Sequence, residues 1–130
     1  MNPVVHFEMP AEDRDRMAGF YSEAFGWKMQ MMGEEMGNYV VAVTSEMDEK
    51  SMRPKMPGTI NGGFYPVKKG DPPSFPSVVI SVEDIQSSMK KITAGGGKLL
   101  GEPINIPNVG QFIAFIDTEG NRVSILQPSM

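Results

Sequence analysis

The sequence predicts an α+β fold built from two βαβββ modules, and three observations lead to this prediction. Between residues 4 and 28 an alternating strand, an acidic helix start and a glycine stop follow one another. The same order returns from Ser77 onward, and one shift along the chain places Asp13 on Asp84 and Gly26 on Gly97. Each half then continues with three more strand-like segments. At 130 residues, the chain is long enough for one domain with a substantial core.

The opening strand of each half alternates between an apolar and a polar face. The polar faces carry His6, the sole histidine, and Glu8 in the first half, and Ser77 in the second. The last strand, Arg122–Leu126, places Ser124 on its polar face. We expect the apolar faces to lie under the two helices; they consist of Val5, Phe7, Met9, Val78, Ile80, Val82, Val123 and Ile125.

A helix is predicted after the opening strand of each half. Asp13 or Glu12 can cap the first helix and Asp84 opens the second, since acidic residues are favoured in the first turn. Gly26 supplies a left-handed stop for the first helix and Gly95–Gly97 closes the second. The stripes expected to face the core are Met17, Phe20, Tyr21, Ala24 and Phe25, and then Ile85, Met89 and Ile92.

Turn signals and prolines divide the remaining residues into strands and loops. The further strands are expected at Trp27–Met32, Asn38–Thr44, Thr59–Val67, Lys98–Leu100, Gln111–Ile116 and Arg122–Leu126. Ser45–Pro57 and Pro103–Pro107 are predicted loops because prolines interrupt them. The single domain 1–130 therefore consists of a first module at about 1–67, a linker at 68–76 stiffened by three prolines, and a second module at 77–130.

Composition and charge exclude several classes of function. Twelve basic and 16 acidic residues give a net charge of −4, so nothing resembles the basic footprint of a nucleic-acid-binding protein. The chain has no cysteine, which excludes disulfides, thiolate metal sites and cysteine nucleophiles. No apolar run approaches the ~20 residues of a membrane span, and residues 1–10 lack a signal-peptide layout. We therefore expect a cytoplasmic protein with neither nucleic-acid nor membrane partners.

Five segments resemble the vicinal oxygen chelate superfamily, which includes glyoxalase I, bleomycin-resistance proteins, fosfomycin-resistance enzymes and extradiol dioxygenases. They are VVHFEMPAED, FYSEAFGW, NGGFYP, VED with the later GGGK, and DTEGNRVSILQP. Together they reach from Pro3 to Pro128. The resemblance implies a glyoxalase-like fold of two βαβββ modules, and it says little about the reaction because the superfamily performs many chemistries on one scaffold.

The resemblance also implies where metal ligands would stand. In metal-using members the ligands come from the first and last strands of each module. His6 matches the first position, whereas Ser77 stands where histidine is usual and Ser124 where glutamate is usual. The last strand of the first module offers Gly62 or neighbours, none of them acidic or histidine. With His6 as the only matching ligand of about four, we expect no cofactor; the alternative is a divalent metal such as Zn, Ni, Mn or Fe.

Two functions stay open, and the sequence does not decide whether the chain is an enzyme. The missing ligands favour a metal-independent small-molecule-binding protein with a cleft between curled sheets. The alternative is a metal-dependent lyase, isomerase or dioxygenase, similar to lactoylglutathione lyase, with His6 and Glu8 as catalytic residues. A homodimer is expected because sheet edges need cover. The candidate ligand-binding residues are His6, Glu8, Trp27, Tyr39, Phe64, Ser77, Phe112 and Ser124.

Overall fold

The computed structural model describes residues 1–129 and confirms the predicted order βαβββ, which occurs twice. One unit, here called the N-terminal unit, comprises His6–Pro76. The other, the C-terminal unit, combines residues 1–5 with the chain from Ser77 onward. Each unit has its own four-stranded mixed sheet and its own apolar core.

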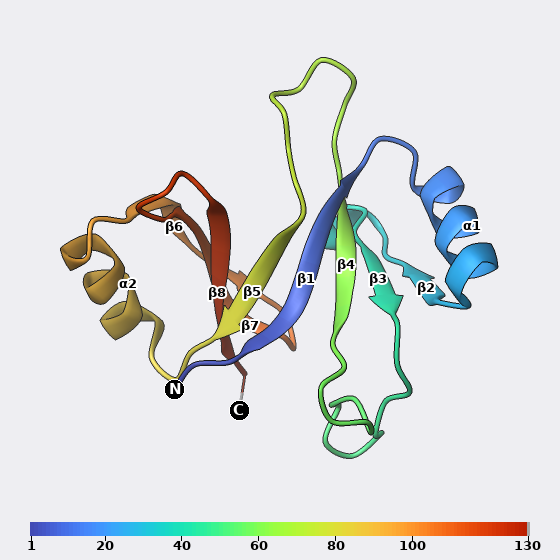
Figure 1. Cartoon of the computed structure of the whole chain (residues 1–130), viewed down its shortest axis with the longest axis horizontal. Coiled ribbons are helices and arrows are strands. Elements are labelled where there is room, and N and C mark those ends of the chain that lie inside the picture. The colour runs from blue at the N-terminus through green and yellow to red at the C-terminus, as the bar shows by residue number, and fades with distance from the viewer. Residues whose placement is uncertain (130) are drawn as a thin grey trace. The chain divides into compact units, whose positions relative to one another are not determined.

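The N-terminal unit packs one helix on a sheet with the order β2-β3-β4-β1. Strand β1 pairs with β4 in parallel, while β4 with β3 and β3 with β2 are antiparallel. Figure 1 shows α1 beside this sheet. The elements are β1 (Val4–Ala11), α1 (Arg14–Phe25), β2 (Lys28–Met31), the 3-10 turn η1 (Glu34–Met36), β3 (Val40–Val43) and β4 (Asn61–Pro66).

The predicted apolar face of β1 forms the core of this unit together with α1. Phe7 packs against the core, and an added Cβ at its strand neighbour Gly62 would lie 2.5 Å from the Phe7 ring. Gly62 is therefore required for close packing of the ring on the strand. The core consists of Ala11, Val40, Ala42 and Phe64, with Phe7, Met9, Met17, Tyr21, Trp27 and Met29 packed against it.

The ends of α1 follow the prediction, but its inward face does not. Asp13 caps the helix by accepting a hydrogen bond from the Arg16 amide, and Gly26 ends it in the left-handed region at φ 73°. Only Ala18 of the helix is buried, whereas Phe20 is 59% and Phe25 is 63% exposed. The predicted stripe was therefore wrong for Phe20 and Phe25, and also for Ala24, which is exposed. Phe20 lies two residues from Ala18 and hence on the other side of the helix.

The C-terminal unit repeats the plan with the sheet order β5-β8-β7-β6. Its helix presents the predicted stripe, because Ile85 is buried in the core and Met89 and Ile92 pack against it. Asp84 caps this helix by accepting from two amides. The elements are β5 (Ser77–Ser81), α2 (Ile85–Ala94), β6 (Lys98–Ile106), β7 (Gly110–Ile116) and β8 (Arg122–Pro128).

Two predictions about strands were wrong. The expected loop Pro103–Pro107 belongs largely to β6, whose pairing shifts register between Leu100 and Ile104. A bulge and an edge position both tolerate proline, which lacks an amide donor. Val5 and Val78 are 38% and 36% exposed, so the apolar face of each opening strand is covered only further along the strand.

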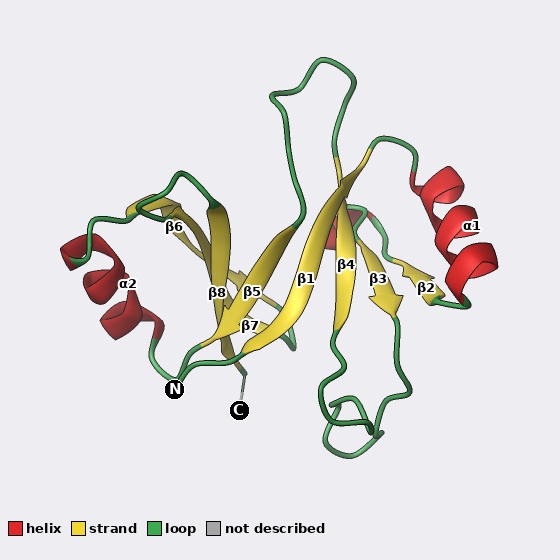
Figure 2. Cartoon of the chain, viewed as in Figure 1, coloured by secondary structure: helices red, strands yellow, loops and turns green. Residues whose placement is uncertain are grey.

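Two long connections lack regular structure, as Figure 2 shows in green. Residues 44–60 join β3 to β4 and carry one isolated bridge, between Met47 and Pro54. Residues 67–76 join β4 to β5. Within the described residues, no helix is both long and apolar enough to cross a membrane.

Candidate functional site

A polar cluster lies on the face of the N-terminal sheet that is turned away from α1. His6 and Glu8 alternate with the core residue Phe7 and therefore share this face. Tyr39 directly precedes β3, whose first residue, Val40, is fully buried on the core side. The alternation along the strand turns Tyr39 toward His6 and Glu8. The predicted polar face of β1 is thus completed by a residue that stands just before β3.

The Tyr39 phenol joins the two β1 side chains. Its oxygen lies 3.0 Å from His6 Nε2 and donates to Glu8 Oε2 at 3.2 Å. The His6 and Tyr39 rings are stacked, with centroids 6.5 Å apart and planes 20° apart. An added Cβ at Gly63, which is the β4 neighbour of Glu8, would collide with the phenol. We call His6, Tyr39 and Glu8 the phenol cluster.

Burial keeps both rings of the phenol cluster neutral. Desolvation lowers the pKa of His6 below its ordinary value, because a charged imidazolium is disfavoured away from water. Desolvation also raises the pKa of Tyr39, and the charge and hydrogen bond of Glu8 raise it further. At neutral pH the site therefore presents an uncharged imidazole and a protonated phenol next to a carboxylate.

This face carries two side chains of the kinds that commonly bind divalent metals, His6 and Glu8. Residues 1–129 contain no group of three or more His, Cys, Asp and Glu side chains that could hold an ion. The His6 Nε2 atom is hydrogen-bonded to the phenol oxygen of Tyr39. Gly63 has no side chain that could act as a metal ligand. The phenol also fills the space that a side chain at position 63 would need. Open catalytic metal sites normally require three protein ligands.

The structure places three other predicted site residues in the C-terminal unit. Ser124 is 2% exposed and lies beside Val79 on one neighbouring strand and Ala114 on the other. Phe112 on β7 pairs with Leu126, and Ser77 begins β5. Ser124 lies between Val123 and Ile125, which pack in the core on the α2 side, so its side chain faces away from that helix.

Trp27 and Phe64, also predicted to bind ligand, lie on the α1 side of the N-terminal sheet. Phe64 is 2% exposed in the core, and Trp27 stacks on Tyr21 with ring centroids 4.7 Å apart. The structure therefore does not bring them together with the phenol cluster. Phe64 instead contributes to the wall of an open hollow on the α1 side of the sheet.

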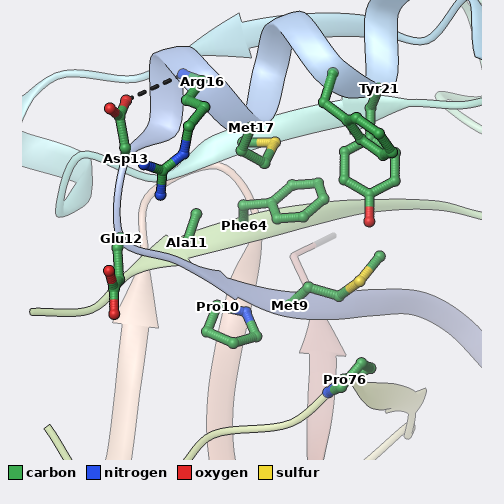
Figure 3. Close-up of a pocket in the computed structure, with 11 residues that line it drawn as sticks. Met9, Pro10, Ala11, Glu12, Asp13, Arg16, Met17, Tyr21, Phe64 and Pro76 are labelled. Carbon is green, nitrogen blue, oxygen red and sulfur yellow. Dashed lines mark hydrogen bonds between the residues drawn. The ribbon is translucent and has the colours of Figure 1, made fainter. Parts of the chain in front are cut away.

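This hollow has a volume of about 550 Å³ and lies between β1, β4 and the start of α1. Figure 3 shows Met9 and Phe64 on the strand side and Met17 and Tyr21 on the helix side. The charged residues at its rim, Glu12, Asp13 and Arg16, carry both signs. The hollow is therefore mainly apolar, without a dominant charge to recognise one class of ion.

Gly63 and Asn61 support the site, and the sequence analysis assigned neither a role in it. Gly63 provides room for the phenol. The Asn61 side-chain oxygen accepts from the amides of Thr44 and Ser45 at 2.7 and 3.1 Å, which ties the chain after β3 to β4. The Gly62-Gly63 pair was the available signal, since adjacent glycines in a strand indicate close approach of another group.

Comparisons with known proteins place this geometry in a family. Residues 4–125 match the model of the Glyoxalase/Bleomycin resistance protein/Dioxygenase superfamily. A glyoxylase-like domain-containing protein of Didymella fabae is 35% identical over 121 residues, which are 91% of this chain and 88% of the relative. The putative glyoxylase CFP32 of Mycobacterium bovis is 28% identical over 124 residues, but this chain spans only 42% of its length.

A solved structure shows the same fold at low sequence identity. Methylmalonyl-CoA epimerase from Mycobacterium tuberculosis superposes with a TM-score of 0.68 at 12% identity, covering 98% of this chain and 88% of the epimerase. The likeness at this identity concerns the fold alone. The family match and the fungal relative extend over nearly the whole chain. The chain therefore belongs to the Glyoxalase/Bleomycin resistance protein/Dioxygenase superfamily.

Proposed function

We propose that this chain is a small-molecule-binding protein of the superfamily and that it works without a divalent metal. The single observation that supports this proposal most strongly is the phenol of Tyr39. It bonds His6 and Glu8 and fills the space beside Gly63, a β4 position on the same face from which a larger side chain could otherwise reach them. The cluster offers hydrogen-bond donors and acceptors, and these orient a bound molecule without an ion.

Under this proposal, ligands contact the polar face of the N-terminal unit. Pockets for small molecules usually combine apolar walls with a few polar groups that fix orientation. His6, Tyr39 and Glu8 supply such polar groups, and each is only partly exposed. We further propose that the protein binds its ligand as a homodimer. The alternative is a metal-dependent lyase, isomerase or dioxygenase. Relatives named as glyoxylases and as a probable lactoylglutathione lyase favour an enzyme of this kind, although their names mention no metal.

Elemental analysis and a thermal-shift screen distinguish the two functions. Untagged protein should contain far less than one metal ion per chain, and Zn, Ni, Mn and Fe salts should leave its melting temperature unchanged. A bound small molecule should raise the melting temperature, because a ligand of the native state stabilises it by mass action. His6→Ala should abolish that increase. Near-stoichiometric metal, or a metal-induced increase that His6→Ala removes, would establish the alternative.

A further inference from the structure

The directions of the hydrogen bonds in the phenol cluster determine which nitrogen of His6 carries the proton. A carboxylate only accepts hydrogen bonds, and a phenol has a single proton to donate. Tyr39 gives that proton to Glu8 Oε2 at 3.2 Å. The contact of 3.0 Å between the phenol oxygen and His6 Nε2 must therefore be a bond in which Nε2 is the donor.

The other ring nitrogen of His6 is left as an acceptor. A neutral imidazole carries one N–H, so a proton on Nε2 leaves a lone pair on Nδ1. Among residues 1–129 the ring makes its hydrogen bond through Nε2 alone. No buried side-chain nitrogen or oxygen in this part of the chain lacks a partner. The Nδ1 atom is therefore accessible from solvent.

The backbone around Tyr39 holds the phenol in place. Arg14 on α1 donates to the carbonyl oxygens of Met32 at 2.8 Å and Asn38 at 3.2 Å, which fixes the turn before β3. The Met32 amide donates to the Tyr39 carbonyl at 2.9 Å. The phenol ring lies over Gly63 of β4, in the space that a side chain there would occupy. Its position is therefore fixed by the hydrogen-bonded backbone before β3 and by the contact with β4.

We propose that Tyr39 is a positioning residue that holds His6 in the Nε2–H form, and that Nδ1 is the atom that the site presents to its ligand. The site would then select a molecule with an O–H or N–H group that donates to Nδ1. The ligand part of this proposal rests on the proposed function of the same face. The positioning part depends only on the three side chains and the backbone that supports them.

Nitrogen NMR of protein labelled with ¹⁵N-histidine tests the positioning role. Because the chain has one histidine, the spectrum contains one pair of ring nitrogens. In the unmodified protein, Nε2 should show the chemical shift of a protonated nitrogen and Nδ1 that of an unprotonated one. Tyr39→Phe removes the acceptor and should produce a mixture of the two tautomers. Tyr21→Phe, the same change on the core side of the sheet, should leave the ring signals unchanged.

Two results would overturn the positioning role: a proton on Nδ1 in the unmodified protein, or an unaltered tautomer in folded Tyr39→Phe. The spectrum of the unmodified protein decides the first point even if the variant fails to fold. Gly63→Ala provides a second approach, because it displaces the phenol while keeping Tyr39. It should also yield mixed tautomers.

Compounds that raise the melting temperature test the ligand part. Each should shift the Nδ1 signal more than the Nε2 signal, and the reverse pattern would contradict the proposal. A screen that yields no binder would remove the proposed function together with this ligand part. The tautomer spectra would still decide the role of Tyr39, so the two failures can be told apart.

Discussion

Gly63 and Tyr39 behave as one structural feature of the site. The phenol can reach His6 and Glu8 only because position 63 has no side chain. Adding a methyl group there forces either the phenol or the strand to move. In well-packed sites such overpacking costs stability because the neighbours must leave their preferred conformations.

Gly63→Ala should therefore lower the free energy of unfolding by about 1–3 kcal/mol. Urea denaturation of the variant and the unmodified protein measures the difference. The double variant Gly63→Ala with Tyr39→Ala provides the control, since it removes the ring that the new methyl group would meet. Its free energy of unfolding should equal that of Tyr39→Ala alone. If Gly63→Ala lowered the free energy of unfolding by a similar amount with Tyr39 present and with Tyr39→Ala, the clash with the phenol would not be the cause.

His6 makes the stability of the protein depend on pH. Burial lowers the pKa of its ring in the folded state, so the folded chain binds the proton less tightly than the unfolded chain, whose ring titrates near 6.5. This contribution is fully present above about pH 6.5 and is lost as the pH falls toward the folded pKa. The urea midpoint should therefore be lower at about pH 5.5 than at about pH 7.5. His6→Gln should flatten this difference, and an equal difference in the variant would refute the assignment to His6.

The sequence predicted part of this cluster for a clear reason. His6 and Glu8 are two residues apart, so strand alternation alone puts them on one face. Tyr39 is 33 positions from His6 and 31 from Glu8. Its place next to them depends on how β3 and β1 register against β4, and no local pattern contains that information.

At the scale of elements, the signals with local causes were reliable. Asp13, Asp84 and Gly26 act within one turn of their own helix, and the structure confirms all three. The inward face of α1 required knowledge of the sheet. Ala18 is small enough to lie against the strands, and this turns Phe20 outward. The course of β6 through Pro103 likewise depends on its edge position and bulge, which only the pairing with β7 reveals.

Helix α1 contains a glycine that is not needed for its structure. Gly19 lies in the middle of the helix, is exposed, and has open space where a Cβ would stand. Gly19→Ala should therefore raise the free energy of unfolding by roughly 0.5–1 kcal/mol, because alanine loses less conformational freedom in a helix. Thermal or urea denaturation measures the gain. Gly26→Ala is the matched control and should destabilise, since Gly26 has a positive φ. If Gly19→Ala left the free energy of unfolding unchanged or lowered it, the added methyl group would not be in open space as the structure shows.

At the scale of the whole molecule, the two modules share a plan but differ in chemistry. Both helices begin at an aspartate cap, and both sheets cover an apolar core on the helix side. The first module carries the phenol cluster on its other face, whereas the position of the second that corresponds to His6 holds Ser77. The family assignment therefore specifies the scaffold, and the side chains on its polar faces have to specify the function.

The sheets of both modules also end in strands with one unpaired edge, β2 in the N-terminal unit and β6 in the C-terminal unit. Unpaired edges and exposed aromatic rings such as Phe20 and Phe25 favour association, because backbone groups and apolar surface gain partners. We therefore expect a homodimer with closed two-fold symmetry. Light scattering after gel filtration should give twice the chain mass at micromolar concentration. If the dimer is needed for binding, diluting the protein until the dimer dissociates should also abolish ligand binding. A stable species with the mass of one chain would contradict the predicted dimer. If that species still bound the same ligand, it would also show that binding does not require a dimer.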